Sequence, residues 1–309
     1  MKVFYVLNKI SKYRRPVVAL GVFDGVHLAH RKILLAAVKK AKEINGTSMA
    51  VTFWPHPQKE SSIYSLEHRL RLLSELGLDV CVVIRFNKKF SRVSAQGFVK
   101  NILLKQIGAH HLYVGKNFHF GKGAKGNFKT LQELSSRHHL KLKLFDVVKR
   151  NNQVMSSTYI RRLISRGELD AAAKILGRPV SILGTVIKGS SIGKRLGFPT
   201  ANIDPHHEVI PPSGVYMVKA IFNNRGLKGI CYIGNRPTFN AQKKNIEVYI
   251  FNFKKNIYGK YLEVLFFKKI REDIKFSSPA DLVKQIKKDV ILVKKRFSLH
   301  LGIPQNMPL

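Results

Sequence analysis

The chain has 309 residues, enough for two domains of about 150 residues with cores of their own. Hydrophobic residues make up 45% of it and charged residues 24%, a composition that excludes an intrinsically disordered chain and a membrane protein. The formal net charge is +37, yet the basic residues are spread through every segment and form no nucleic-acid-binding motif, so we expect no specific nucleic-acid partner.

The first half of the chain alternates between strand and helix signals. A buried strand at 16–23 precedes a helix at 31–44, whose apolar residues recur at helical spacing. Further buried strands are expected at 48–54, 79–86, 111–115 and 142–148, and further helices at 94–108 and 130–138. Strands separated by helices predict an α/β domain with a Rossmann-like parallel sheet, in which ligands bind beyond the carboxyl ends of the strands.

The pattern changes at 177–186, after two helices expected at 156–167 and 169–177. Strands then follow one another with turn signals between them, at 181–189, 214–222, 228–234, 245–253 and 260–270. This succession predicts an antiparallel barrel or sandwich, closed by an amphipathic helix at 278–297 with Ser278 or Ser277 as its N-cap. We therefore place a domain boundary near residue 180, which gives domains 1–180 and 181–309.

The sequence shows no pattern typical of a signal peptide, a membrane span or a disulfide framework. The first twenty residues contain no continuous apolar run with a cleavage site, and the best apolar run elsewhere, 262–267, is strand-sized. We expect a cytoplasmic protein that does not contact a membrane. Cys81 and Cys231 lie in apolar runs, where buried reduced thiols are expected instead of a disulfide or a zinc site. The sequence predicts no oligomeric state.

The segment from Gly21 to His30 lies at a strand-to-helix turn, where free backbone N–H groups and the helix dipole favour a bound phosphate. His27 and His30 are three residues apart, so they share one face of the first helical turn and can donate to a phosphate together. Two solvated surface histidines would have the same spacing. The glycine-flanked Phe23-Asp24 turn beside them favours the phosphate site.

Ser156, Ser157 and Thr158 begin a helix that also carries Arg161. The hydroxyls can cap the helix, and the guanidinium can bridge phosphate oxygens. From these residues alone we prefer a plain N-cap with a surface arginine.

The segment 189–202 is punctuated by glycine and is basic, but it lacks the Walker spacing. Thr200 and Asn202 alternate along an extended stretch and so point to one side, where they offer two neutral oxygen ligands for Mg²⁺. A proline-containing turn is the alternative interpretation. Glu247 is a lone carboxylate in an apolar strand, a position that predicts either a function or a solvent-facing side chain on a half-exposed strand.

The stretch GVFDGVHLAH at 21–30 resembles the G-x-F-D-G-x-H-x-G-H motif of the bacterial bifunctional riboflavin kinase/FAD synthetases, which belong to the nucleotidyltransferase superfamily. The resemblance continues in order through nearly the whole chain: TFWPHP, VGKNFHFGKGAKG, SSTYIR, LGRP, GFPTANI, PPSGVY, IGNRPTF, IEVYIF and KKIRED. It implies an N-terminal domain that makes FAD from FMN and ATP. It also implies a C-terminal barrel that makes FMN from riboflavin and ATP.

The resemblance also implies roles for individual residues. In the N-terminal half it implies catalytic roles for His27 and His30, FMN binding by Pro55, His56, Asn117 and Phe120, and ATP binding by Gly21, Phe23, Asp24, His27, His30, Ser156, Ser157, Thr158 and Arg161. In the C-terminal half it implies Glu247 as the general base, Arg271 at the flavin, Mg²⁺ on Thr200 and Asn202, and ATP binding by Gly189, Gly193, Lys194, Gly197, Thr200 and Asn202.

The chain departs from the family pattern at two positions. Ala29 replaces the glycine before the second motif histidine, and Tyr232 stands where the family's N-I-G-x-R-P-T run has asparagine. Asn117 and Ala124 fit one of the two patterns of their region, Asn with Ala instead of Asp with Arg. Because Ala29 could crowd the phosphate, a kinase with a weakened adenylyltransferase half is the nearest alternative. A basic nucleic-acid-binding protein on a borrowed fold is the alternative from another class.

The N-terminal half contains a second sequence pattern that is typical of phosphate binding. Gly121, Gly123 and Gly126 spell G-x-G-x-x-G, and Asp146 lies twenty residues beyond, as in a dinucleotide-binding fingerprint. The stretch 117–120 separates these glycines from the strand at 111–115, which is poor context for an NAD site. We interpret the glycines as a backbone flap over the flavin-side substrate.

Overall fold

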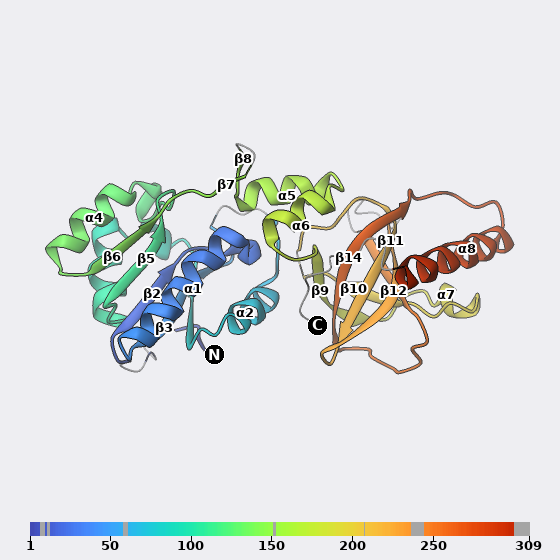
Figure 1. Ribbon diagram of the computed structural model, residues 1–309, viewed down its shortest axis with the longest axis horizontal. Helices are drawn as coiled ribbons and strands as arrows, with labels where there is room; N and C mark the ends of the chain where they lie inside the picture. The colour runs from blue at the N-terminus through green and yellow to red at the C-terminus, as the bar shows by residue number, and fades with distance from the viewer. Residues whose placement is uncertain are drawn as a thin grey trace. The chain divides into compact units, whose positions relative to one another are not determined.

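The computed structural model describes residues 1–6, 10, 13–57, 61–150, 153–206, 208–235 and 244–299 (Figure 1). The chain divides into two compact units, Met1–Tyr159 and Ile160–Leu309. Each unit has its own sheet and its own buried core. Part of the IGNRPTF motif, residues 236–239, lies outside the described residues.

The N-terminal unit is built on a six-stranded parallel sheet in the order β1-β4-β3-β2-β5-β6. Its strands are β1 (Lys2–Phe4), β2 (Pro16–Leu20), β3 (Thr47–Trp54), β4 (Val80–Arg85), β5 (His111–Gly115) and β6 (Lys141–Phe145). This confirms the predicted α/β class. Because β3 lies on one side of β2 and β5 on the other, the chain changes direction across the sheet at β2, which is where open parallel sheets bind ligands.

Helices connect these strands. They are α1 (Leu28–Glu43), α2 (Leu66–Glu75), α3 (Ala95–Gly97), which continues as a π-helix (Phe98–Gln106), and α4 (Phe128–Arg137). The buried residues of α1 recur at helical spacing, and α1 packs on β2, β3 and β5. Helix α2 was not among the predicted elements, although Ser65 caps it by accepting the His68 backbone N–H at 3.3 Å.

The C-terminal unit contains a closed antiparallel barrel in the order β10-β13-β12-β11-β14-β9, as the sequence predicted. Its strands are β9 (Ser181–Ile187), β10 (Ala201–Asp204), β11 (Gly214–Phe222), β12 (Arg225–Asn235), β13 (Lys244–Ile250) and β14 (Tyr261–Arg271). The helices are α6 (Leu169–Leu176), the short α7 (Ile192–Arg195) and α8 (Pro279–Ser298). Before them, β7 (Lys149–Arg150) pairs with β8 (Gln153–Val154), and α5 (Ser157–Ser165) spans the division between the units.

Helix α8 begins at the predicted Ser278 cap, whose hydroxyl accepts the Asp281 backbone N–H at 3.2 Å. It packs on the outside of the barrel, where Val293 and Phe297 contact a cluster from β11, β12 and β14. Tyr232 of β12 packs against this cluster and lies opposite Glu247 of β13 in register. Since paired residues share a face of the sheet, Glu247 points to the same outer face, while Val248 points into the barrel.

Both cysteines are free and buried, as the sequence predicted. Burial raises the pKa of the Cys81 thiol to about 12 and also raises the pKa of Cys231. Thiols with such raised pKa values stay protonated and unreactive.

Candidate active sites

The turn after β2 is held by a buried carboxylate. Phe23 and Gly25 take up left-handed backbone angles, with φ of 52° and 80°. Asp24 is 1% exposed, and its carboxylate accepts the backbone N–H groups of Ile63 and Tyr64 at 2.9 and 3.3 Å. A side chain at Gly25 would clash with Ile63. The Asp24 side chain therefore fixes the shape of the turn.

The two motif histidines lie together at the start of α1. His27 is the N-cap residue, and its Nδ1 accepts the backbone N–H of His30 at 3.4 Å. The two imidazole rings are stacked with centroids 3.6 Å apart, and the Phe23 ring packs edge-on against His30 at 5.4 Å. The N-terminus of a helix and two imidazoles are thus brought to one point. Such an arrangement can neutralise charge on phosphate oxygens.

Helix α5 begins beside this turn. The Ser157 hydroxyl donates to the backbone carbonyl of Asp24 at 2.9 Å, across 133 residues of sequence. Ser156 caps the helix by accepting the Tyr159 N–H at 3.2 Å. Thr158 is exposed, whereas Arg161 is buried with 9% exposure, unlike the surface arginine that the residues alone favoured.

The residues expected at FMN follow β3 and β5, on either side of β2. Pro55 comes directly after β3 and is followed by the buried His56. Asn117 is exposed after β5, and Phe120 is buried and stacked against Phe118 with an angle of 9° between the rings. An aromatic wall of this kind suits a planar heterocycle.

The competing glycine pattern forms a closed loop. Phe120 and Gly126 exchange two backbone hydrogen bonds of 3.0 and 2.9 Å, and Gly121 and Gly123 both have positive φ. Asp146, the acidic residue of that pattern, is exposed and pairs with Lys116 at 2.6 Å.

In the C-terminal unit, three predicted residues meet across two strands. The Thr200 hydroxyl donates to Glu247 Oε2 at 2.9 Å, and Asn245 Nδ2 donates to Glu247 Oε1 at 2.5 Å. Asn202 of β10 lies opposite Glu247 of β13 in register. It is 6% exposed, and among the described residues its Oδ1 atom has no hydrogen-bond partner. A carboxylate, a hydroxyl and an unpartnered amide oxygen therefore form one cluster.

The glycines before this cluster leave room for it. A Cβ atom at Gly189 would overlap the Asn202 side chain, and one at Gly193 would lie 2.5 Å from the Phe198 carbonyl oxygen. Gly197 has a φ of 87°, and Lys194 is exposed on α7. The segment thus combines close backbone approach with a nearby positive charge, as phosphate binding requires.

Tyr232, the residue that departs from the family pattern, lies opposite Glu247 on β12, whereas Asn202 lies opposite Glu247 on β10. Its hydroxyl is 3.2 Å from both carboxylate oxygens of Asp273, two residues after Arg271. Burial, with Asp273 as the next cause, raises the pKa of Tyr232 to about 12, so the phenol stays a hydrogen-bond donor. Strand order therefore places Glu247 between Asn202 on one side and Tyr232 on the other.

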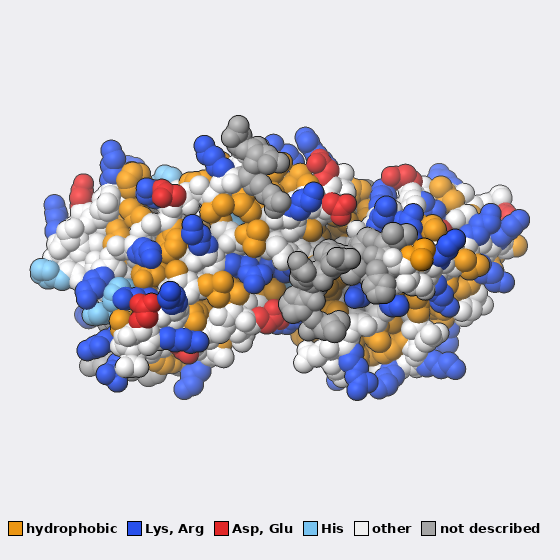
Figure 2. Space-filling model, in the orientation of Figure 1, with side chains coloured by type: hydrophobic (Ala, Val, Ile, Leu, Met, Phe, Trp, Pro, Cys, Tyr) orange, Lys and Arg blue, Asp and Glu red, His pale blue; other side chains and the backbone are white. Residues whose placement is uncertain are grey.

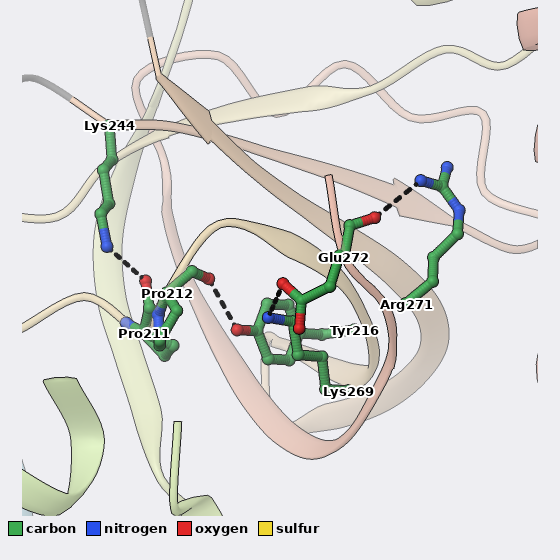
Figure 3. A network of polar contacts seen from close by, with 7 residues as sticks. All are labelled: Pro211, Pro212, Tyr216, Lys244, Lys269, Arg271 and Glu272. Atoms are coloured by element: carbon green, nitrogen blue, oxygen red, sulfur yellow. Dashed lines mark hydrogen bonds and ion pairs between the residues drawn. The ribbon is translucent and has the colours of Figure 1, made fainter. Parts of the chain in front are cut away.

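Arg271 is held at the end of β14 by two further contacts. Its Nε atom pairs with Asp289 of α8 at 2.9 Å. Its Nη1 atom donates to the Glu272 carbonyl at 3.0 Å (Figure 3). Asp289 is buried and also accepts from Gln285 at 2.8 Å. A carboxylate on a closing helix was not predicted as part of the site, because nothing in its spacing links it to β14.

The barrel end beside Arg271 is tied to the proline turn before β11. Lys244 donates to the Pro211 carbonyl at 2.7 Å, and Tyr216 donates to the Pro212 carbonyl at 2.6 Å (Figure 3). Lys269 pairs with Glu272 at 2.5 Å. Burial, followed by repulsion from Lys269, lowers the pKa of Lys244.

Basic side chains are dispersed over the visible surface of both units, with apolar and neutral groups between them (Figure 2). No helix among the described residues is long and apolar enough to cross a membrane. The described residues also contain no group of three or more His, Cys, Asp or Glu side chains that could hold a metal ion.

Comparisons with known proteins match both units. Residues 9–159 match a family model described as FAD synthetase, and residues 176–297 match one described as riboflavin kinase. A bifunctional riboflavin kinase/FMN adenylyltransferase from Buchnera aphidicola subsp. Schizaphis graminum is 36% identical over 304 residues, which cover 95% of this chain and 97% of the relative. A Bacillus subtilis protein with the same description is 34% identical, over 89% and 90% of the two chains.

The solved structures include one with a similar fold over nearly the full length. It is a crystal structure described as a macrolide-efflux protein from Streptococcus pneumoniae, with a TM-score of 0.83 and 27% identity. The match covers 95% of this chain and 99% of that one.

Proposed function

The chain belongs to the bifunctional riboflavin kinase/FMN adenylyltransferases, and from that premise we propose that each of its units carries one of the family's two reactions. Riboflavin is phosphorylated to FMN by ATP, and FMN is adenylylated to FAD by a second ATP with release of pyrophosphate. We assign FMN adenylylation to residues 1–180 and riboflavin phosphorylation to residues 181–309.

For the kinase reaction, Glu247 is the proposed general base. The two hydrogen bonds from Thr200 and Asn245 fix the orientation of its carboxylate. The carboxylate accepts the proton of the riboflavin 5′-hydroxyl as that oxygen bonds to the γ-phosphorus of ATP, and the bond to the departing ADP breaks. Arg271, held by Asp289, is proposed to contact the flavin.

Mg²⁺ fits the residues beside this base. The buried Asn202 Oδ1 atom without a partner and the neighbouring Thr200 hydroxyl are hard, neutral oxygen ligands of the kind that Mg²⁺ accepts. We propose that these two residues and the ATP phosphates together bind the Mg²⁺ ion. When bound, the ion neutralises charge on those phosphates. Gly189, Gly193, Lys194 and Gly197 are proposed to approach the same phosphates.

For the adenylyltransferase reaction, a phosphate oxygen of FMN attacks the α-phosphorus of ATP and pyrophosphate leaves. His27, His30 and the N-terminus of α1 are proposed to stabilise the charge on the departing group, together with Ser156, Ser157, Thr158 and Arg161. Gly21, Phe23 and Asp24 shape the ATP-binding turn, and Pro55, His56, Asn117 and Phe120 are proposed to bind FMN. The stacking of His27 on His30 supports a joint role.

The observation that carries the assignment is the meeting of Thr200, Asn202 and Glu247, since the fold brings together three residues that the sequence had proposed for one reaction. The experiment is incubation of the purified chain with riboflavin and Mg-ATP, followed by chromatography of the flavins. We expect FMN first and FAD after it. FMN that never becomes FAD would favour a weakened adenylyltransferase half, and unchanged riboflavin would refute the proposal.

A further inference from the structure

Arg69 of α2 is a buried cation that neither proposed reaction uses. Its side chain is 0% exposed. The Nη1 atom lies 2.7 Å from the Val22 carbonyl oxygen, 3.1 Å from the Thr52 hydroxyl and 3.3 Å from the Phe53 carbonyl oxygen. The guanidinium carbon also lies 5.4 Å from the centre of the Trp54 ring. One nitrogen therefore joins the ends of two neighbouring strands.

These two strand ends lead into the two proposed substrate segments. Val22 directly precedes the Phe23-Asp24 turn of the ATP side, and Phe53 lies two residues before Pro55 of the FMN side. The Thr52 hydroxyl strengthens the link, because it donates to the same Val22 carbonyl at 2.7 Å.

Asp24 connects the ATP-binding turn to the segment before α2. Its carboxylate accepts the N–H groups of Ile63 and Tyr64, which lie just before the helix that carries Arg69. The attraction of Asp24 also opposes the effect of burial, which is the larger one and lowers the pKa of Arg69. The ATP turn, the FMN segment and α2 are thus fastened to one another by two buried charges.

Stability alone is a weak reason for such a residue. Taking a guanidinium out of water is costly, and well-packed apolar residues often stabilise a core as well or better. Among the described residues, Nε and Nη2 of Arg69 are buried without a hydrogen-bond partner, so much of that cost is not recovered. What the guanidinium contributes is a fixed spacing between two carbonyl groups on different strands.

We propose that Arg69 is a positioning residue for FMN adenylylation, which holds the ATP-binding turn and the FMN-binding segment at the spacing that the attack on the α-phosphorus requires. This inference rests on the proposed function of the N-terminal unit. Loss of the link leaves each substrate its own contacts and misaligns the two reactants. The expected signature is therefore a lower kcat for FAD formation with small changes in the KM values of ATP and FMN.

The test compares four variants in the full chain. Arg69→Met should lower kcat for FAD formation by about 10²-fold, the typical effect of misplacing reactants by an ångström. Arg69→Lys keeps the charge without the guanidinium geometry and should lose less. Thr52→Val removes the shared hydroxyl with little change in shape and should also lower kcat, whereas Thr52→Ser should restore it. Riboflavin phosphorylation in the same samples should stay at the wild-type rate.

Arg71→Met is the matched control, because Arg71 lies on the same helix but pairs at the surface with Glu75 at 3.2 Å. It should behave as wild type. If Arg69→Met does not fold, as judged by its thermal midpoint, Arg69→Lys and Thr52→Val decide the question.

A wild-type kcat in these folded variants would overturn the inference, and so would a loss in Thr52→Ser equal to that in Thr52→Val. A rise in KM with unchanged kcat would also overturn it. If the wild-type chain itself makes no FAD, the proposed function fails. If the wild-type chain makes FAD and the variants make it at the same rate, only the role of Arg69 fails.

Discussion

The histidine motif of the candidate site in the N-terminal unit is local in sequence, whereas the Thr200–Glu247 cluster of the C-terminal unit is assembled across strands. Phe23, His27 and His30 lie within one turn and the start of one helix. Thr200 and Glu247 are 47 residues apart and meet because β10 pairs with β13. A local site depends on backbone conformation, and a cross-strand site depends on register. The two sites should therefore respond differently to substitution.

Separating the units is the strongest test of this comparison. A fragment that begins at Pro179 should phosphorylate riboflavin and form no FAD, because it lacks the whole N-terminal unit. A second fragment that begins at Glu168 keeps α6, which packs on β14, and should have the higher thermal midpoint. Flavin chromatography and thermal unfolding are the measurements. An inactive, unfolded product from both fragments would contradict independent units.

Glu247→Gln should have the largest effect of any single substitution on the kinase reaction. It keeps the size of the side chain and an oxygen that can accept from Thr200, but it removes the base. A positioned general base contributes about 10²- to 10⁴-fold in rate, so FMN formation should fall within that range. Conversion of added FMN to FAD should persist in the same sample. Near-normal phosphorylation by the folded variant would show that this carboxylate is not the base.

His30→Ala should produce the mirror image. Loss of one preorganised donor typically costs about 10²-fold, so FAD formation should fall by that order while riboflavin phosphorylation is spared. The substitution also removes one ring of the His27 stack. His138→Ala, at the end of α4 in the same unit, is the matched control. Equal loss of both activities in His30→Ala would mean that the residue has a structural role.

Tyr232→Phe should give a smaller effect, on the flavin side of the cross-strand site. It removes the hydrogen bond to Asp273, worth about 0.5 to 1.5 kcal/mol, so the KM for riboflavin should rise by roughly two- to twelvefold. The KM for ATP should stay constant. Asp273→Asn retains an acceptor and should resemble wild type. An equal rise in both KM values would show that Tyr232 does not act on the flavin side alone.

Ala29→Gly is expected to have the smallest effect. If the methyl group narrows the approach to phosphate, the glycine variant should form FAD faster, and the initial rate of FMN adenylylation measures this. Glycine in place of alanine should also destabilise the helix by about 1 kcal/mol. An unchanged rate would remove the reason for suspecting a weakened adenylyltransferase half.

Sequence reasoning reached the elements whose signals are local. The buried strand PVVAL, the alternation of strands and helices and the change of pattern near residue 180 each follow from neighbouring residues, and the parallel sheet and the barrel confirmed the predicted architecture. The pairing of Thr200 with Glu247 was not predictable in this way, since register depends on turns and on packing across the whole barrel. The alternation of Thr200 and Asn202 predicted a Mg²⁺ site, but the assignment of Thr200 and Glu247 to the same reaction came from resemblance.

Burial was the property that sequence patterns described least well. Arg69 lies in an amphipathic stretch that begins with a good cap at Ser65, yet neither the helix nor its arginine was predicted. Arginine normally marks the exposed face of a helix, so a buried one contradicts the usual pattern. Asp24 and Asp289 are similar: Asp24 accepts from the Ile63 backbone 39 residues away, and Asp289 pairs with Arg271 18 residues away, which spacing does not reveal.

The two sheets also differ in how they end. Every described strand of the closed barrel is paired on both sides, so the described part of the barrel has no outer strand open to another chain. Among the described strands of the parallel sheet, β6 is an outer strand with one paired side, and it exposes Lys141 and Lys143. Lysine on an outer strand discourages the addition of a strand from a neighbouring molecule. Part of the large positive charge thus protects against edge-to-edge aggregation, a protection that the barrel obtains from its closure.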